Sequence, residues 1–105
     1  SKFIYYKCIM TNVPSGWSKK NEKLLLVLKC DDFMHAIALL NFVADIAEKM
    51  QHHPDIAVRN YNELLISTTT HSEKKLTVKD YELAKKVSDL IDYQAEKQNI
   101  EDNGR

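Results

Sequence analysis

Histidine is the residue type in this sequence that is best suited to carry chemistry. The chain of 105 residues has four histidines, His35, His52, His53 and His71, and the middle two stand side by side before Pro54. An imidazole with an unperturbed pKa of about 6.5 can give or take a proton near neutral pH. The adjacent pair therefore predicts either the positively charged end of a helix or half of an acid–base site that needs a third group.

His71 is the natural third group, because its surroundings place it at the end of a strand, just before a loop. A metal site is the other way to use three histidines, since three imidazoles are a known set of zinc ligands. Adjacent residues such as His52 and His53 rarely point at one ion, and the spacing to His71 fits no common zinc motif. The spacing therefore disfavours a metal, and it leaves open whether the pair caps the helix or takes part in proton transfer. We expect His35 to have a structural or surface role.

Composition excludes several other classes of function. The 15 Lys and Arg residues balance the 15 Asp and Glu residues, so the chain lacks the positive surplus that nucleic-acid binding requires. Gly16 and Gly104 are the two glycines, which leaves no glycine-rich phosphate-binding motif. No apolar stretch approaches the roughly 18 residues of a membrane span. Two cysteines are too few for a disulfide framework and favour a reducing compartment, the cytoplasm.

The pattern of apolar residues predicts two hairpins, each followed by a helix. Turn residues and strand-like runs predict hairpins over 17–30, around Asn21-Glu22, and over 56–70, with the turn near 60–62. The run from Leu24 to Leu28 does not alternate with polar residues, so we expect both faces of that strand to be covered. The order hairpin, helix, hairpin, helix predicts an α+β domain whose antiparallel sheet is covered by helices on one side.

The two helices have clear start signals. Asp31-Asp32 caps the first, Pro54 limits its end, and its predicted buried stripe consists of Phe33, Ile37, Leu40, Val43, Ala44, Ala47 and Met50. Thr77 and Asp80 resemble a capping box at the start of the second. We expect one domain over 1–105, in which 1–13 has no assigned element and 97–105 is a frayed tail.

Taken together, the motif residues resemble the signature of the pterin-4a-carbinolamine dehydratases. That signature runs from Glu48 through His52-His53-Pro54, Tyr61 and His71 to Asp80. The flanking stretches agree with it, namely Gly16-Trp17, Phe42-Val43-Ala44, Thr69-Thr70, Leu76-Thr77 and Leu83-Ala84. The likeness covers about residues 16 to 95. The sequence departs from the family pattern before Gly16, where it lacks the long helix of many members, and at Ile56-Ala57, where a bulkier pair is usual.

The resemblance implies a four-stranded antiparallel sheet with helices on one face. It also implies a hydro-lyase that dehydrates 4a-hydroxytetrahydropterin to quinonoid dihydropterin, in tetrahydrobiopterin recycling, without metal or organic cofactor. His52, His53 and His71 would be the catalytic histidines, with His52 and His71 favoured as the proton-transfer pair. The remaining site residues implied are Pro54, Thr70, Ser72 and Glu73, which would contact the pterin with the histidines, and Glu48 and Asp80, which would support them.

The resemblance leaves one rival function open. Some members of the family also serve as dimerisation cofactors of a homeodomain transcription factor, and such a binding protein could keep the same fold. It would also place the chain in the nucleus as well as the cytoplasm. Either function implies a homodimer or homotetramer that does not contact nucleic acid or a membrane directly. Retention of all three histidines favours the enzyme.

Overall fold

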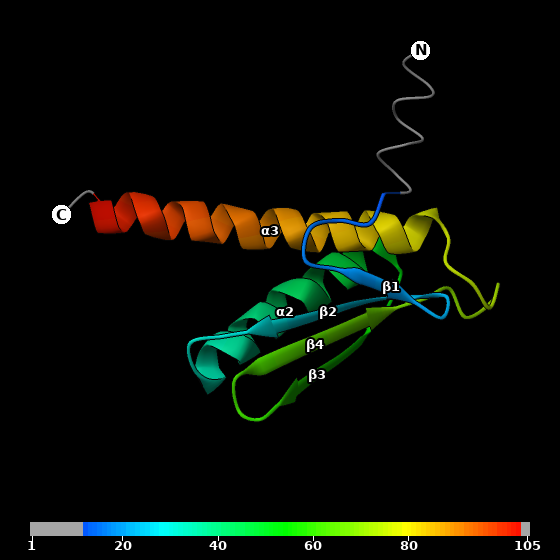
Figure 1. Cartoon of the computed structure of the whole chain (residues 1–105), viewed down its shortest axis with the longest axis horizontal. Helices are drawn as coiled ribbons and strands as arrows, with labels where there is room; N and C mark the ends of the chain where they lie inside the picture. Colours follow the sequence, from blue (N-terminus) through cyan, green and yellow to red (C-terminus); the bar gives the residue numbers. More distant parts are fainter. Residues whose placement is uncertain (1–11, 104–105) are drawn as a thin grey trace, which may run out of the picture.

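The computed structural model of the chain describes residues 12–103, and the side chains of 12–97. Its elements are β1 (Ser18–Lys20), β2 (Lys23–Lys29), α2 (Phe33–Met50), β3 (Asp55–Arg59), β4 (Glu63–Thr68) and α3 (Val78–Asn103). The strands form one antiparallel sheet in the order β1-β2-β4-β3, and both helices pack on the same face of it (Figure 1). This confirms the predicted α+β class and the order of the elements.

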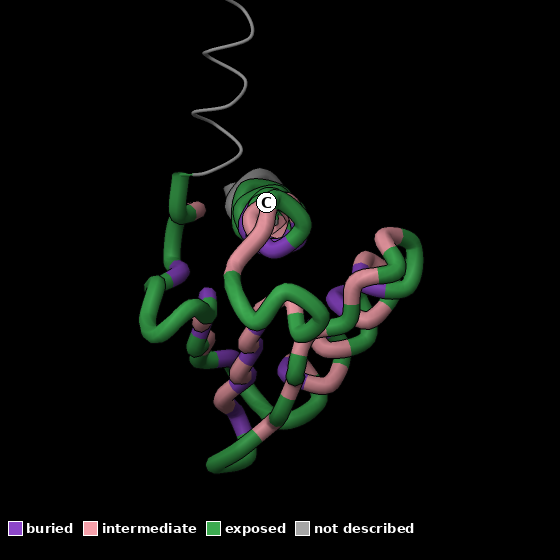
Figure 2. The backbone as a smooth tube through the Cα atoms, turned by 90° about the vertical axis from the view of Figure 1, so that its right-hand side faces the viewer, coloured by how far each residue is buried: buried purple, intermediate pink, exposed green. Residues whose placement is uncertain are grey.

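The core lies between this face of the sheet and the two helices. Its largest fully buried apolar side chains are Leu24, Leu64, Ile66, Val43, Leu83 and Val87. Figure 2 shows that the buried residues lie on segments that face this interior, whereas most of the loop backbone is exposed. Truncating a core leucine to alanine typically costs 2–5 kcal/mol, so this core is what holds the site-bearing segments together.

Strand β2 is covered on one face, so the expectation that both of its faces are covered was wrong. Leu24 and Leu26 are buried, but Val27 is 43% exposed. Side chains of a strand alternate between the faces of a sheet, and both helices lie on the face of Leu24 and Leu26. Val27 lies on the other face, opposite Leu65 of β4.

Helix α2 begins and ends where the sequence predicts, but it is rotated relative to the predicted stripe. The Asp32 side chain accepts a hydrogen bond from the His35 amide at 2.8 Å, which is the expected N-cap. The buried residues are Ala36, Leu39, Val43 and Ala47. Phe33, predicted to be buried, is 49% exposed, whereas Ala36 and Leu39, which were not in the predicted stripe, are buried.

Helix α3 is longer than predicted. It begins after Thr77 and continues to Asn103, so the tail expected to fray from residue 97 is helical as far as it is described. No glycine or proline occurs between 78 and 103, and Gly104 follows, which explains why the helix continues so far. Residues 1–11 and 104–105 lie outside the described residues, and so does most of the predicted N-terminal segment 1–13.

Candidate active site

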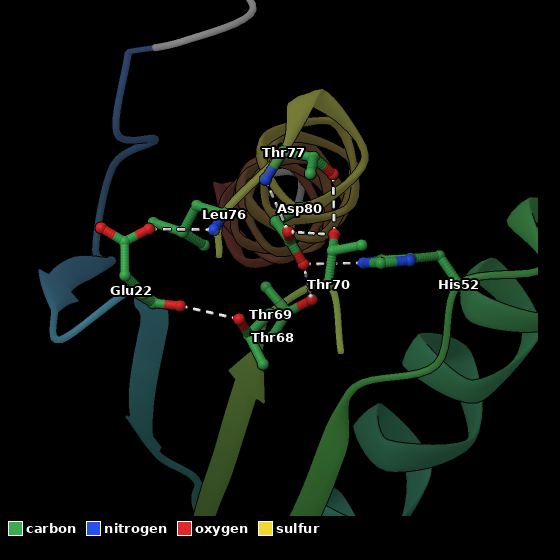
Figure 3. A network of polar contacts seen from close by, with 8 residues as sticks. All are labelled: Glu22, His52, Thr68, Thr69, Thr70, Leu76, Thr77 and Asp80. Carbon is green, nitrogen blue, oxygen red and sulfur yellow. Dashed lines mark hydrogen bonds and ion pairs between the residues drawn. The ribbon is translucent and has the colours of Figure 1, made fainter. Parts of the chain in front are cut away.

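The site is built around Asp80, a completely buried carboxylate in the first turn of α3. Its Oδ1 lies 2.7 Å from His52 Nε2 and accepts a 2.6 Å hydrogen bond from the Thr68 hydroxyl. Its Oδ2 accepts hydrogen bonds from the Thr70 hydroxyl at 2.7 Å and from the Thr77 amide at 3.0 Å (Figure 3). The partners come from the chain after α2, the end of β4 and both ends of the loop between β4 and α3, so one carboxylate of α3 connects these segments.

Asp80 is ionised because its hydrogen bonds outweigh its burial. Burial alone would raise the pKa of this carboxyl, but hydrogen bonds from His52, Thr68, Thr70 and the Thr77 amide together lower the pKa below its ordinary value. A carboxylate can only accept, so the His52 nitrogen that faces it must carry a hydrogen. Neutral His52 is therefore the tautomer with hydrogen on Nε2 and a lone pair on Nδ1.

The donor and the acceptor can also be assigned for the hydrogen bonds that the hydroxyl groups around Asp80 make. The Thr70 hydroxyl has one hydrogen, which it donates to Asp80 Oδ2. The Thr77 hydroxyl, 2.7 Å from the Thr70 oxygen, must therefore be the donor in that contact. Thr77 and Asp80 were expected to resemble a capping box, and one half of it is present, since the Thr77 amide donates to the Asp80 carboxylate. The other half is missing, because the Thr77 hydroxyl is bonded to Thr70.

The end of α2 positions the two adjacent histidines differently. The helix is capped at its C-terminus by Gln51, whose backbone is in the left-handed region with φ of 53°. The His52 amide then donates to the Ala47 carbonyl at 3.1 Å. The His52 side chain then lies toward α3 and is 10% exposed. The His53 side chain is 58% exposed, and its Nε2 lies 3.5 Å from Glu48 Oε2 at the surface.

His71 lies on the loop that joins β4 to α3. It directly follows Thr70, and it is exposed together with Ser72, Glu73 and Lys74. The loop closes on itself, because the Glu73 and Lys74 amides donate to the carbonyls of Thr70 and His71 at 3.1 and 3.2 Å. The structure thus brings Asp80 into contact with His52, and Glu48 into contact with His53. His71 directly follows Thr70, a hydrogen-bond partner of Asp80, and its side chain is exposed.

Sequence reasoning missed one residue of this centre and assigned another differently. Thr68 was not singled out, although it is 1% exposed and bonded to Asp80. A signal was present, because Thr68 shares the buried face of its strand with Ile66, and a buried hydroxyl needs a polar partner. Thr70, which was expected to contact substrate, also belongs to this centre, because its hydroxyl is bonded to Asp80 and Thr77.

Two further findings concern the residues that the structure describes. Within 12–103 no three His, Cys, Asp or Glu side chains are grouped so that they could hold a metal ion. In the same part of the chain, neither helix combines the length and the apolar character that crossing a membrane requires.

Comparison with known proteins finds the same family from sequence and structure. The family model described as pterin 4 alpha carbinolamine dehydratase matches residues 7–90. A protein of Sulfolobus acidocaldarius named "Putative pterin-4-alpha-carbinolamine dehydratase" is 40% identical over 75 residues, which are 71% of this chain and 81% of that protein. A protein of the same name from Trichormus variabilis is 40% identical over 76 residues, 72% of this chain and 81% of its own length.

A solved structure has the same fold. The crystal structure of the transcriptional coactivator/pterin dehydratase from Brucella melitensis superimposes with a TM-score of 0.65 at 28% sequence identity. The match covers 82% of this chain and 87% of that one. The similarity of fold therefore extends over most of both chains.

Proposed function

The chain belongs to the pterin-4a-carbinolamine dehydratase family, and we propose that it dehydrates 4a-hydroxytetrahydropterin by histidine acid–base catalysis. Membership of the family supports pterin-4a-carbinolamine dehydratase activity, while the residues that perform it are our assignment. The observation that carries this assignment is the 2.7 Å contact between His52 and the buried, ionised Asp80.

Loss of water from this substrate requires two proton movements. The substrate carries a hydroxyl group on C4a beside an N5–H group. An acid protonates the hydroxyl as the C4a–O bond breaks, and a base takes the proton of N5 as the C4a–N5 double bond forms. Water and quinonoid dihydropterin are the products, and no electron is gained or lost. Positioned proton transfer of this kind is typically worth about 10²–10⁴-fold in rate.

We assign His52 to one of these two transfers because Asp80 determines where its protons lie. With hydrogen held on Nε2 by the carboxylate, the neutral ring keeps the Nδ1 lone pair as a base. A proton taken up at Nδ1 gives a cation next to Asp80, which compensates the charge in an interior where an unpaired charge is costly. The same atom can then return the proton, so His52 can act as either acid or base.

The other two histidines have different proposed roles. His71 is the proton-transfer partner, because it follows Thr70, whose hydroxyl is bonded to the same carboxylate as His52. His53 binds substrate, because it is exposed and its weak contact with Glu48 leaves it able to meet a polar ligand. The other proposed contacts with the pterin come from Pro54, Thr70, Ser72 and Glu73 on the adjoining segments.

The test is a stopped-flow dehydration assay on freshly generated 4a-hydroxytetrahydropterin. We expect the purified protein to accelerate dehydration, and to do so equally in the presence of a strong chelator, because the mechanism uses imidazoles and protons. His35→Ala is the matched control, since His35 Nδ1 accepts the Asp31 amide at the start of α2, far along the helix from His52. Absence of acceleration, or loss on chelation with recovery on adding zinc, would contradict the mechanism.

We also propose a cytoplasmic homodimer or homotetramer that works in tetrahydrobiopterin recycling. Exposed apolar side chains on α2 and on the open face of the sheet support an assembly, namely Val27, Phe33, Met34 and Phe42. Light scattering that shows a stable 12.2 kDa monomer at micromolar concentration would contradict it. Binding of a transcription factor, suggested by the name of the Brucella relative, becomes the better function if folded His52→Ala and His71→Ala variants both turn over normally.

A further inference from the structure

Two carboxylate residues hold the loop that carries His71, and one of them lies outside the site described above. Asp80 binds Thr70 and Thr77 from the α3 side. From the other side, Glu22 contacts the residue before Thr70 and the residue before Thr77 (Figure 3). The Thr69 hydroxyl donates to the Glu22 carbonyl at 2.7 Å, and the Leu76 amide donates to Glu22 Oε2 at 3.1 Å.

Glu22 reaches both ends of the loop because of its place in the first hairpin. It is the second residue of the two-residue turn between β1 and β2, where Asn21 and Glu22 have φ of 51° and 60°. The contacts with Thr69 and Leu76 span 47 and 54 residues of sequence. These two hydrogen bonds connect the turn of the first hairpin to both ends of the loop between β4 and α3.

The loop has few buried contacts, so hydrogen bonds within it and at its ends hold its shape. Its two ends are bridged by the Thr70 amide, which donates to the Lys75 carbonyl at 3.2 Å. The four residues between, 71–74, are exposed and form turns. A loop with few buried contacts samples many conformations unless hydrogen bonds restrict its base. The position of His71 is therefore determined mainly by the residues that hold positions 69, 70, 76 and 77.

We propose that Glu22 is a positioning residue for His71. By holding Thr69 and Leu76 it keeps the loop in the conformation in which the His71 ring meets the pterin, and it touches neither substrate nor His71 itself. The inference rests on the proposed role of His71 in dehydration. Catalytic groups must be held close to their productive geometry, and small displacements are costly in rate, which is why an exposed carboxylate at a distance can affect turnover.

The same residue could instead matter only for the shape of its own hairpin turn. Thr69→Val separates the two explanations, because it changes a contact of Glu22 without changing the turn. Glu22→Gln is the conservative variant, because glutamine has the same length and retains an oxygen that accepts the Leu76 amide. Glu22→Ala keeps the backbone carbonyl that Thr69 binds but removes the contact with Leu76. Thr69→Val removes the other contact and leaves the turn sequence unchanged. Glu63→Ala is the matched control, since that carboxylate binds Arg59 and Asn60 within the second hairpin.

The first measurement is independent of activity. Amide hydrogen exchange at Leu76 and the NMR signals of the His71 ring report directly on the base and the tip of the loop. We expect Glu22→Ala to speed exchange at Leu76 by roughly tenfold, the effect of losing one hydrogen bond, and to shift the His71 ring signals. Glu22→Gln and Glu63→Ala should resemble wild type at both positions.

The second measurement is the dehydration assay. Glu22→Ala should lower kcat by roughly tenfold while KM stays within about twofold, because the position of a proton-transfer group changes rather than substrate affinity. Thr69→Val should act in the same direction, and Glu22→Gln should recover most of the rate. In a His71→Ala background, Glu22→Ala should have no further effect, since residues that act as a unit are non-additive.

Three results would overturn the inference. They are unchanged Leu76 exchange in Glu22→Ala, a Glu22→Gln variant as slow as Glu22→Ala, and a full additional loss when Glu22→Ala is combined with His71→Ala. A wild-type protein without dehydratase activity would overturn the proposed function instead. In that case exchange at Leu76 and the His71 ring signals would still decide whether Glu22 holds the loop.

Discussion

His52 and His53 are neighbours in the chain, yet they occupy opposite environments. His52 is 10% exposed and lies 2.7 Å from a carboxylate that is fully buried. His53 is 58% exposed and lies 3.5 Å from Glu48, whose side chain is 70% exposed. Both are histidine–carboxylate pairs, and they differ in burial and in the number of further partners that the acid has.

The difference shows that burial and the hydrogen-bond partners of the carboxylate determine which protonation states and ligands an imidazole can have. Water screens the pair at the surface, so contacts of the His53–Glu48 type are typically worth 0–1 kcal/mol. Asp80 is fully buried and has four hydrogen-bond donors, so removing it leaves buried polar groups without an acceptor. The buried pair therefore determines both the tautomer of His52 and part of the stability of the fold, whereas the exposed pair leaves His53 able to bind a ligand.

The largest expected effect is on stability, in Asp80→Ala. His52, Thr68, Thr70 and the Thr77 amide would all lose their shared acceptor in the interior. We expect the free energy of unfolding to fall by about 3–5 kcal/mol, the usual cost of breaking a buried charged pair. Urea-induced unfolding followed by circular dichroism measures it.

Glu48→Ala is the matched control for this prediction, because it removes the acid of the exposed pair. The free energy of unfolding should change by less than about 1 kcal/mol. Should Asp80→Ala leave too little folded protein to measure, Thr68→Val removes one of the four donors and should cost about 1 kcal/mol. Equal losses in Asp80→Ala and Glu48→Ala would abolish the distinction between the two pairs.

The next largest effect is on turnover. His52→Ala and His71→Ala should each slow dehydration by roughly one to three orders of magnitude, as expected when a general acid or base is removed. The double variant should approach the uncatalysed rate without multiplying the two losses, since both residues serve one reaction. Stopped-flow assays measure these rates, after circular dichroism has shown that each variant is folded. Normal turnover in both single variants would contradict the proposed mechanism.

Acidification should distinguish the buried carboxylate from other acids. Hydrogen bonds hold the pKa of Asp80 below the ordinary value of about 3.9, so its stabilising contribution is complete above that value and lost as the pH falls through the lower folded-state pKa. The stability difference between wild type and Asp80→Asn should therefore shrink as the pH falls below about 4. Urea unfolding at several pH values measures it, and a difference that stays constant to pH 2 would refute the assignment.

The smallest effect is expected on the exposed side of the comparison. His53→Ala should raise KM more than it lowers kcat, because a binding contact is felt equally in the ground state and the transition state. Steady-state titration of substrate separates the two parameters. A fall in kcat as large as that of His52→Ala, with KM unchanged, would assign His53 to proton transfer as well.

Local signals explain why the order of the elements could be predicted from the sequence. Asp32 caps α2 and Pro54 limits it, while Asn21-Glu22 lies between two strand-like runs; each signal acts over a few residues. Histidine spacing likewise indicated the candidate site. His52 and Asp80, which are hydrogen-bonded although they lie 28 residues apart, could be named by their resemblance to a family signature.

The errors concern properties that depend on tertiary contacts. An uninterrupted apolar run does not reveal that helices cover one face of β2, so the exposure of Val27 was missed. The rotation of α2, which exposes Phe33, depends on how the helix packs against the sheet and α3, which its own sequence pattern does not specify. The role of Thr68 depends on Asp80, 12 residues away, and that of Glu22 on Thr69, 47 residues away. None of these partners is indicated by a local pattern.

The left-handed backbone at Glu22 has a consequence for engineering the protein. Two-residue hairpin turns of this kind favour glycine at the second position, and a side chain there costs about 1 kcal/mol of backbone strain. Glu22→Gly should therefore make the protein more stable and, by releasing Leu76, a slower catalyst. Tyr61, with φ of 56° and 65% exposed, has a similar backbone in the second hairpin without this contact, so Tyr61→Gly should stabilise without slowing turnover. Selection for thermostability alone would thus gain stability at the cost of activity at the first turn, and would gain stability without that cost at the second.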